Sequence, residues 1–346
     1  MTTQRGPTAP PGETARAPHR WRPPSLPARV AYGAWVYGVL APAMRTLRVL
    51  GLERKAVSAA MSRRARRLEG DDPFRGYLPG PRDVVVSTYA KSGTHWMLQV
   101  AHQLLHHGRG EYAHLHDVVP WPDDDELPRL ARGRAVPLDD DAVARACPEG
   151  RRVIKTHLPA RRLRLDGGAR FLVVVRDPKD VFVSGYHFVR DTVLGPAMPS
   201  VRTWLRLFLQ GKALGGSWPA HAAGWWRRRH LPGVAVFSFK AMKADLERTV
   251  RAVARHLGVA ADDDVVARVC ARSSFEAMRA DAAKYTFGRL LPWRRERPVL
   301  RRGAHGGSAE LLTPAQQREL DATMLHELGR HGSDLPYDDF AERATP

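Results

Sequence analysis

Four short runs of β-branched and aromatic residues recur along the chain, and segments with helical spacing separate them. Each run is short and apolar enough for a buried strand, and the four runs are residues 83–89, 152–156, 171–175 and 234–237. After the last run, one helical face carries Leu246, Val250, Val253, Ala254 and Leu257. This alternation predicts an α/β fold in which helices flank both faces of a central parallel sheet.

The segment after the first strand also has helical spacing. Its expected buried face consists of Trp96, Met97, Val100, Ala101 and Leu104. The opposite face carries three histidines, which are His102, His106 and His107. We expect these histidines to contact solvent rather than a metal, and we expect no metal site elsewhere in the chain.

The first strand runs into the turn Lys91-Ser92-Gly93-Thr94, and a helix follows the turn. Glycine lets the backbone approach an anion, while the first amides and the dipole of the helix favour negative charge. The turn departs from the nucleotide triphosphatase loop because its lysine precedes the glycine. It therefore predicts a P-loop-NTPase-like site that binds a phosphorylated ligand.

The ends of two further strands carry polar residues. After the third run, Asp177 is a suitable N-cap and Pro178 fits the first helical turn, so this strand also ends in a helix. Arg176 and Ser184 can then reach one phosphate beyond the sheet edge, where ligands bind in open α/β sheets. At the end of the second run, strand geometry points Lys155 and His157 to the same face.

These motifs resemble, in order and spacing, the cytosolic-type sulfotransferase family. The resemblance covers roughly residues 72–335 and also rests on Gly216-Ser217-Trp218, Trp225-Trp226, Ser273-Ser274-Phe275 and Arg301-Arg302-Gly303. It implies a bacterial-type member with the family's P-loop-like fold. It also implies transfer of a sulfuryl group from 3′-phosphoadenosine 5′-phosphosulfate (PAPS) to a hydroxyl or amine of a small-molecule, glycoside or lipid-like acceptor.

The resemblance further implies a role for each matching residue. The 5′-phosphosulfate would be held by Lys91, Ser92, Gly93, Thr94 and His95, with Trp96 stacked on the adenine. The 3′-phosphate would be held by Arg176, Ser184, Arg301, Arg302 and Gly303, and the adenine side would be formed by Ser273 and Phe275. His157 corresponds to the general base, Lys155 stabilises the transferring group, and Lys91 also acts in catalysis.

The chain departs from the family pattern at three places. Phe239 stands where the family usually has tyrosine, so we expect an apolar adenine contact without a hydrogen bond. Residues 304–310 replace a Gly-Asp-Trp-Lys continuation, which predicts looser closure over the cofactor. Ala309 and Arg318 replace a lysine and a glutamate of the family's dimerisation segment, so the oligomeric state stays open.

The chemistry is consistent with these roles. Sulfuryl transfer resembles loose phosphoryl transfer, in which positioning and stabilisation of charge dominate. A histidine with an ordinary pKa of ~6.5 is neutral enough at pH 7 to accept a proton. The alternatives are a nucleotide-dependent small-molecule kinase and an inactive binding or membrane-recruited relative; the presence of Lys91, Lys155 and His157 together argues against the latter.

Composition narrows the partners. The 55 Lys and Arg residues against 36 Asp and Glu give a net charge of +19, which we interpret mainly as solvated surface because no nucleic-acid motif accompanies it. The acidic runs at 123–126 and 139–141 are expected to be exposed loops rather than catalytic carboxylates. Two cysteines, Cys147 and Cys270, are too few for a disulfide framework, which favours the cytoplasm.

The sequence divides into a disordered basic arm (1–28), a helical extension (29–70) and a sulfotransferase domain (71–340). The uncharged run 30–44 would form a helix of only ~22 Å against a hydrocarbon core of ~30 Å, so it is not expected to span. The helix either docks on the domain or an acceptor-side lid, or lies in a membrane interface. In the interfacial case Val30, Trp35, Val36, Val39 and Leu40 face the lipid, and the arginines near 63–67 approach anionic headgroups.

Overall fold

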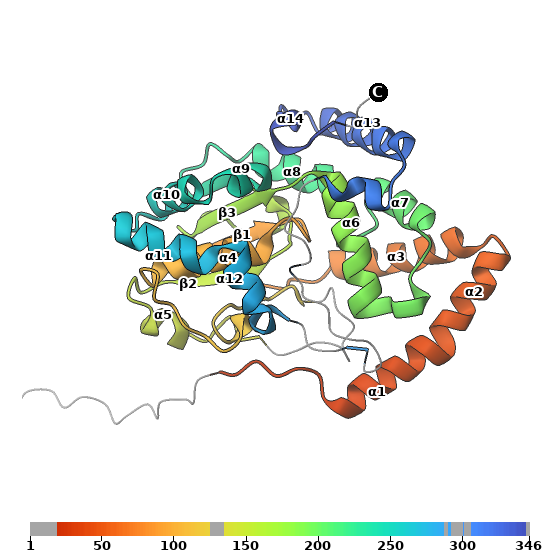
Figure 1. Cartoon of the computed structure of the whole chain (residues 1–346), viewed down its shortest axis with the longest axis horizontal. Coiled ribbons are helices and arrows are strands. Elements are labelled where there is room, and N and C mark those ends of the chain that lie inside the picture. Colours follow the sequence, from red (N-terminus) through yellow and green to blue (C-terminus); the bar gives the residue numbers. More distant parts are fainter. Residues whose placement is uncertain (1–18, 125–134, 287–289, 292–299, 301–305, 344–346) are drawn as a thin grey trace, which may run out of the picture.

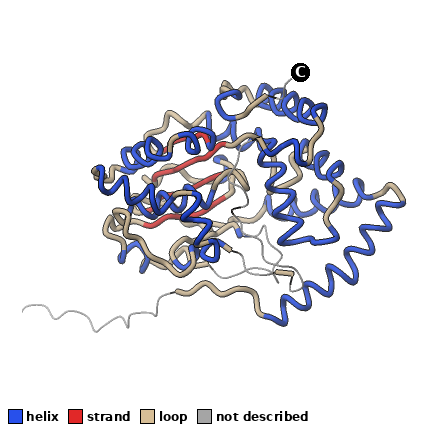
Figure 2. The backbone as a smooth tube through the Cα atoms, in the orientation of Figure 1, coloured by secondary structure: helices blue, strands red, loops and turns tan. Residues whose placement is uncertain are grey.

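The computed structural model describes residues 19–124, 135–286, 290–291, 300 and 306–343. Its centre is a sheet (Figure 2). The strands of this sheet are parallel and lie in the order β2-β1-β3-β4. The strands are β1 (Asp83–Thr88), β2 (Arg152–Thr156), β3 (Arg170–Val175) and β4 (Val234–Ser238). All four predicted runs and the predicted parallel arrangement are thereby confirmed.

The strand order creates a crevice at one edge of the sheet. The chain passes from β1 outward to β2 and then returns across β1 to form β3. The connections that follow β1 and β3 therefore leave the sheet side by side and in opposite directions, which is where open α/β sheets bind ligands. Lys91 and Arg176 stand on these two connections.

Helices cover both faces of the sheet (Figure 1). Alternate residues of the strands point to opposite faces, so Leu172 and Val174 pack on one side while Phe171 and Val173 pack on the other. The first side is covered by α4 (Thr94–Leu105), α10 (Leu246–Leu257) and α11 (Asp263–Ser273). The second is covered by α6 (Pro178–Phe188), α7 (Val201–Leu209), α8 (Trp218–Trp226) and α13 (Pro314–Arg330).

Shorter elements connect these layers. The remaining α-helices of the described domain are α5 (Ala142–Ala146), α9 (Phe239–Ala244), α12 (Phe275–Ala280) and α14 (Tyr337–Phe340). Single turns of tighter helix lie at Leu115–Asp117, Ala160–Arg162, Gly195–Ala197, Ala282–Tyr285 and Gly307–Glu310, and a π-helical turn extends α6 over Val189–Leu194. The expected N-cap at Asp177 is present, since its carboxylate accepts the Lys179 backbone N–H at 2.8 Å.

The expectation that His102, His106 and His107 contact solvent is wrong for His102. His102 is buried, because α4 lies between the sheet and α11 and its ring packs against Tyr112 at 5.1 Å. His106 is half-buried and contacts His102 at 4.2 Å between ring centroids. Helical spacing identified the strongly apolar face of α4, but a second layer of helices covers the opposite face as well.

The amino-terminal extension is helical and packs on the domain. A nearly continuous helix comprises α1 (Leu26–Trp35), a π-helical turn (Val36–Leu40) and α2 (Ala41–Val49), and α3 (Glu53–Glu69) then folds back along the domain (Figure 1). Tyr32 and Val36 are buried against Ala197 and Leu291, and the Tyr32 hydroxyl donates to the Val193 carbonyl at 3.0 Å. The docked arrangement is therefore the one that the structure shows.

Two expectations for this extension change. The lipid-facing set is split, because Val36 is fully buried whereas Trp35 and Val39 are 48% and 59% exposed. The arm expected to be disordered through residue 28 is ordered near its end, since the Trp21 ring stacks on His114 at 4.0 Å and α1 begins at Leu26. Within the described residues, no helix combines the length and apolarity that crossing a bilayer requires.

Candidate active site

The turn after β1 has the backbone geometry of an anion cradle. Gly93 precedes α4 with φ of +99°, and a Cβ placed there would lie 2.6 Å from the Phe239 ring. Lys91 also has a positive φ of +70°. Thr88 and Thr94 join their hydroxyls at 2.6 Å across the turn. Only glycine fits at position 93, so the turn presents backbone amides close to the first turn of α4.

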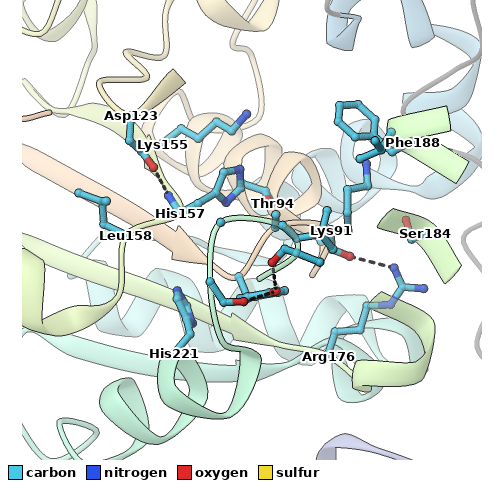
Figure 3. Close-up of a pocket in the computed structure, with 18 of the residues that line it drawn as sticks. Lys91, Thr94, Asp123, Lys155, His157, Leu158, Arg176, Ser184, Phe188 and His221 are labelled. Carbon is cyan, nitrogen blue, oxygen red and sulfur yellow. Dashed lines mark hydrogen bonds between the residues drawn. The ribbon is translucent and has the colours of Figure 1, made fainter. Parts of the chain in front are cut away.

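Arg176 meets this turn from the neighbouring strand, as the sequence predicts (Figure 3). Its guanidinium Nη1 donates to the Lys91 carbonyl at 3.1 Å, and Asp180 lies 3.4 Å from Nη2. The indole of Trp218 donates to the Arg176 carbonyl at 3.1 Å and fixes the strand end. Ser184 lines the same cavity from α6, so two of the five residues predicted to hold the 3′-phosphate line one cavity.

Three of the cavity cations, Lys91, Lys155 and Arg176, each lie on an aromatic ring. Lys91 Nζ lies 4.2 Å from the Phe188 ring centroid, and Lys155 Nζ lies 3.2 Å from that of Trp121. Arg176 Cζ lies 4.3 Å from the Phe239 ring. A cation on an aromatic face gains about 0.5–2 kcal/mol, which offsets part of the repulsion between neighbouring positive charges. The cations are thus held near one another at the cavity wall.

His157 is oriented by the main chain around it. Its Nδ1 lies 2.8 Å from the Thr88 carbonyl, which can only accept, so Nδ1 carries the proton and Nε2 is the basic nitrogen. Burial, and after it the charge of Lys155, holds the pKa of His157 well below its usual range. The imidazole is therefore neutral at pH 7. Lys155 and His157 line the same cavity, as strand geometry predicts.

Asp123 is a site residue that the sequence analysis misplaced. The expectation of an exposed acidic loop is wrong here, because Asp123 is only 6% exposed and its carboxylate accepts the His157 backbone N–H at 2.7 Å (Figure 3). Burial raises the pKa of Asp123 to about 6, although the His157 N–H, the Thr156 hydroxyl and the Lys155 charge oppose that rise. The available signal was the stiff Pro120-Trp121-Pro122 segment directly before it, which differs from an ordinary solvated loop.

A second histidine, His95, lies at the start of α4. It is buried and lines the cavity. Burial, followed by the charge of Lys155, holds the pKa of His95 well below its usual range. His95 therefore presents neutral polar nitrogen atoms at the predicted 5′-phosphosulfate end.

Aromatic side chains form the opposite end of the cavity. Trp96 meets Phe239 edge to face at 5.5 Å, and its indole donates to the Ser273 carbonyl at 2.8 Å. Phe275 lines the cavity from α12. Flat apolar faces of this kind suit a nucleobase, and Phe239 supplies ring area without a hydroxyl.

Not all predicted residues reach the cavity surface. Ser92 and Ser273 are fully buried behind its wall. Arg301, Arg302 and Gly303 lie outside the described residues, as do His305 and the acidic residues 125–126. Their predicted contacts stay predictions.

The cavity has a volume of about 820 Å³ and extends from the aromatic end, past Lys91 and His157, to the amino-terminal extension. Small-molecule sites commonly occupy about 300–1,000 Å³, so two ligands can meet near His157. The Gly93 cradle, the three cations and the aromatic end fit a nucleotide with two anionic groups. Among the described residues, no cluster of three or more His, Cys, Asp or Glu side chains could hold a metal ion, and the expectation of metal-free catalysis stays a prediction.

Similar proteins match this architecture along most of the chain. Sulfotransferase 1C2 of Rattus norvegicus is 27% identical over 263 residues, which cover 72% of this chain and 84% of that protein. Sulfotransferase 1A1 of Canis lupus familiaris is 29% identical over 264 residues, covering 73% of this chain and 86% of that protein.

Two solved structures share the fold. Retinol dehydratase in complex with androsterone and the inactive cofactor PAP superposes with a TM-score of 0.65 at 18% identity, covering 80% of this chain and 88% of that one. Mouse sulfotransferase SULT7A1 complexed with PAP has a TM-score of 0.59 at 22% identity, covering 80% of this chain and 96% of that one. The family model of the sulfotransferase domain matches residues 81–332, most of the chain, and the chain therefore belongs to the sulfotransferase family.

Proposed function

We propose that this sulfotransferase moves the sulfuryl group of PAPS to a hydroxyl or amine of a small amphipathic acceptor, with His157 as the general base. The observation that supports this most is the Nδ1 bond of His157 to the Thr88 carbonyl, because it leaves Nε2 as the basic nitrogen in a cavity shared with Lys91 and Lys155. Phenolic, glycosidic and lipid-like alcohols all present the hydroxyl group that this reaction requires.

The donor would supply an activated sulfuryl group, and residues of this chain would hold it. The Gly93 turn, His95 and Lys91 would hold the 5′-phosphosulfate, while Arg176 and Ser184 would hold the 3′-phosphate. Trp96, Phe239 and Phe275 would receive the adenine. Two anionic groups and one aromatic base match the distribution of cations and rings along the cavity.

The reaction needs one proton transfer and stabilisation of one developing charge. His157 Nε2 would accept the acceptor's proton as the acceptor oxygen forms its bond to sulfur, and the neutral state of the imidazole at pH 7 suits that task. Lys91 and Lys155 would stabilise the negative charge on the bridging oxygen of the leaving nucleotide, whose bond to sulfur breaks.

The test is transfer of labelled sulfate from PAPS to phenolic, glycosidic and lipid-like acceptors by the full chain, with His157→Ala as the comparison. Sulfation by the wild type, and retention of 3′,5′-bisphosphoadenosine binding by an inactive His157→Ala variant, are expected. Binding that requires ATP and magnesium instead would favour a kinase, and cofactor binding without transfer to any acceptor would favour an inactive relative.

We further infer a cytoplasmic enzyme that contacts anionic membranes peripherally. Trp35 and Val39 form an exposed apolar strip on the docked helix, and the exposed Arg63 lies on the adjoining α3. An apolar strip with basic neighbours matches an anionic lipid surface. Co-sedimentation with anionic vesicles should be salt-sensitive and should be lost in a Trp35→Glu, Val39→Glu variant. Equal sedimentation of that variant and the wild type would exclude this contact.

A further inference from the structure

The far end of the cavity is closed by α3, which lies outside the region that matches the family model. Val57, Met61 and Arg64 of α3 line the cavity, whereas the family match begins at residue 81. This wall therefore lies outside the segment that the family model matches. A side chain of α3 can therefore contact the acceptor without contacting the donor, because the predicted donor contacts begin at the Gly93 turn.

The α3 wall is anchored by buried polar contacts. The Glu53 carboxylate, at the start of α3, accepts the hydroxyls of Ser200 and Thr203 at 2.7 Å each. Lys212 Nζ donates to the Ser58 hydroxyl at 2.8 Å, which ties α3 to the segment after α7. These contacts hold α3 in one position against the domain, so its cavity-lining side chains form a defined surface.

The body of this end is apolar. It is lined by Val57 and Met61 from α3, Leu158 after β2, Leu194, Trp204 and Leu214. The Tyr89 hydroxyl donates to the carbonyls of Ala213 and Gly216 at 2.9 Å each, so the acceptor-side segment is joined to the turn that carries Lys91. An apolar acceptor body would therefore lie between α3 and the catalytic residues.

Basic side chains also line the cavity. The lining residues include Arg64 on α3, Arg161 and Arg162 after β2, and Lys212, whereas Asp71 is the carboxylate at this end. Burial, followed by the charge of Arg161, lowers the pKa of the cavity residue His221 to about 3. Arg161 thus lies close to the part of the cavity wall that His221 forms.

Arg64 lines the cavity from α3. Its charge acts on the buried Tyr32, whose hydroxyl donates to the carbonyl of Val193, another cavity residue. Arg64 and Arg161 therefore approach the acceptor end from two different elements, α3 and the Ala160–Arg162 turn. Two guanidinium groups from separate elements, in a cavity that also has an apolar lining, match an anionic group carried on an apolar body.

We propose that the preferred acceptor is an anionic amphiphile, in which Arg64 and Arg161 bind a carboxylate, phosphate or sulfate while its hydroxyl reaches His157. This proposal rests on the proposed function and defines its acceptor class. It assigns a specificity role to α3 that the family domain alone would lack.

The test compares two phenols that differ only in charge, para-hydroxyphenylbutanoate and para-butylphenol. Binding of each to the full chain is measured by calorimetry in the presence of 3′,5′-bisphosphoadenosine, and labelled-sulfate transfer is measured in parallel. The wild type should bind the carboxylate about tenfold more tightly, a difference of about 1.4 kcal/mol, as expected for a partly buried charge pair. Arg64→Met and Arg161→Met should each remove most of that advantage and leave the neutral phenol unaffected.

Arg66→Met is the matched control, because Arg66 lies on α3 but is exposed and does not line the cavity. It removes one positive charge from the same helix and should leave both affinities unchanged. The proposal is overturned if the wild type shows no preference for the carboxylate, if neither phenol binds, or if Arg66→Met has the same effect as Arg64→Met. Turnover of the neutral phenol without an anionic preference would refute this proposal alone, whereas binding without any transfer would refute the proposed function.

Discussion

The buried carboxylate of Asp123 should couple stability to pH with an unusual sign. Burial raises its pKa from 3.8 to about 6, and its folded-state pKa therefore lies above the unfolded value. The folded protein binds the proton more tightly, so the free energy of unfolding contributed by this group falls as pH rises from about 4 to about 6 and is constant above that range. At about 1.4 kcal/mol per pKa unit, the loss is about 3 kcal/mol.

Asp123→Asn removes this ionisation and keeps an oxygen that can accept the His157 N–H. Between pH 4 and pH 7, the wild type should therefore lose up to about 3 kcal/mol of unfolding free energy that the variant does not lose. Part of the gain at pH 7 is offset, because an amide NH₂ would replace Oδ1, which has no partner among the described residues, at a cost of about 1–3 kcal/mol. Chemical denaturation of both proteins across this pH range measures the shift.

Asp123→Ala separates this charge effect from the positioning of the base. It leaves the His157 N–H unpaired in a buried position, and a lost hydrogen bond to a charged group of about 1.5–3 kcal/mol corresponds to a fall in turnover of roughly ten- to a hundredfold. Asp123→Asn should retain most of the turnover. A variant difference in stability that does not change with pH, or full turnover in Asp123→Ala, would refute the reasoning.

Three further predictions concern the base, the cofactor and the extension. His157→Ala should lower turnover by ~10²–10⁴ while 3′,5′-bisphosphoadenosine binding is retained, and normal turnover would remove His157 from the mechanism. Arg176→Ala should weaken PAPS binding roughly ten- to a hundredfold but hardly affect a donor without the 3′-phosphate; equal losses for both donors in a competition assay would contradict this contact. Burial alone would raise the pKa of Glu53, but hydrogen bonds from Thr203, Ser200 and Arg48 outweigh burial and lower that pKa to about 2. Glu53→Gln should therefore lower the free energy of unfolding by about 1.5–3 kcal/mol above pH 5, and this difference should vanish as pH falls toward 2. Denaturation curves in which the difference between variant and wild type does not change with pH would contradict this prediction.

Local sequence determined the sheet and most of the donor side. The four runs formed strands because each supplies apolar residues to the helix layers on both faces of the sheet, as a strand covered on both sides requires. Asp177 and Pro178 fixed the start of α6, and Gly93 fixed the turn before α4, since these effects act within a few residues. Because the strands are parallel, their carboxyl ends lie at the same edge of the sheet, and this brings Lys91, Lys155 and Arg176 to that edge.

Tertiary structure decided which polar residues are buried. Asp123 belongs to an acidic run that resembles a solvated loop, yet the fold places its carboxylate against the His157 main chain. His102 occupies the less apolar side of its helix, yet α11 and Tyr112 enclose it. Burial of a polar group depends on partners far away in sequence, so local periodicity does not determine it.

The amino-terminal helix illustrates the same division. Its apolar run predicts a helix with a face that avoids water, and both a docked and an interfacial helix satisfy that pattern. The structure buries Tyr32 and Val36 and leaves Trp35 and Val39 exposed. It also places α3 along the acceptor end of the cavity. Sequence determined the helices and their apolar content, whereas their surroundings depend on long-range packing against Ala197 and Leu291, residues that no local pattern links to this segment.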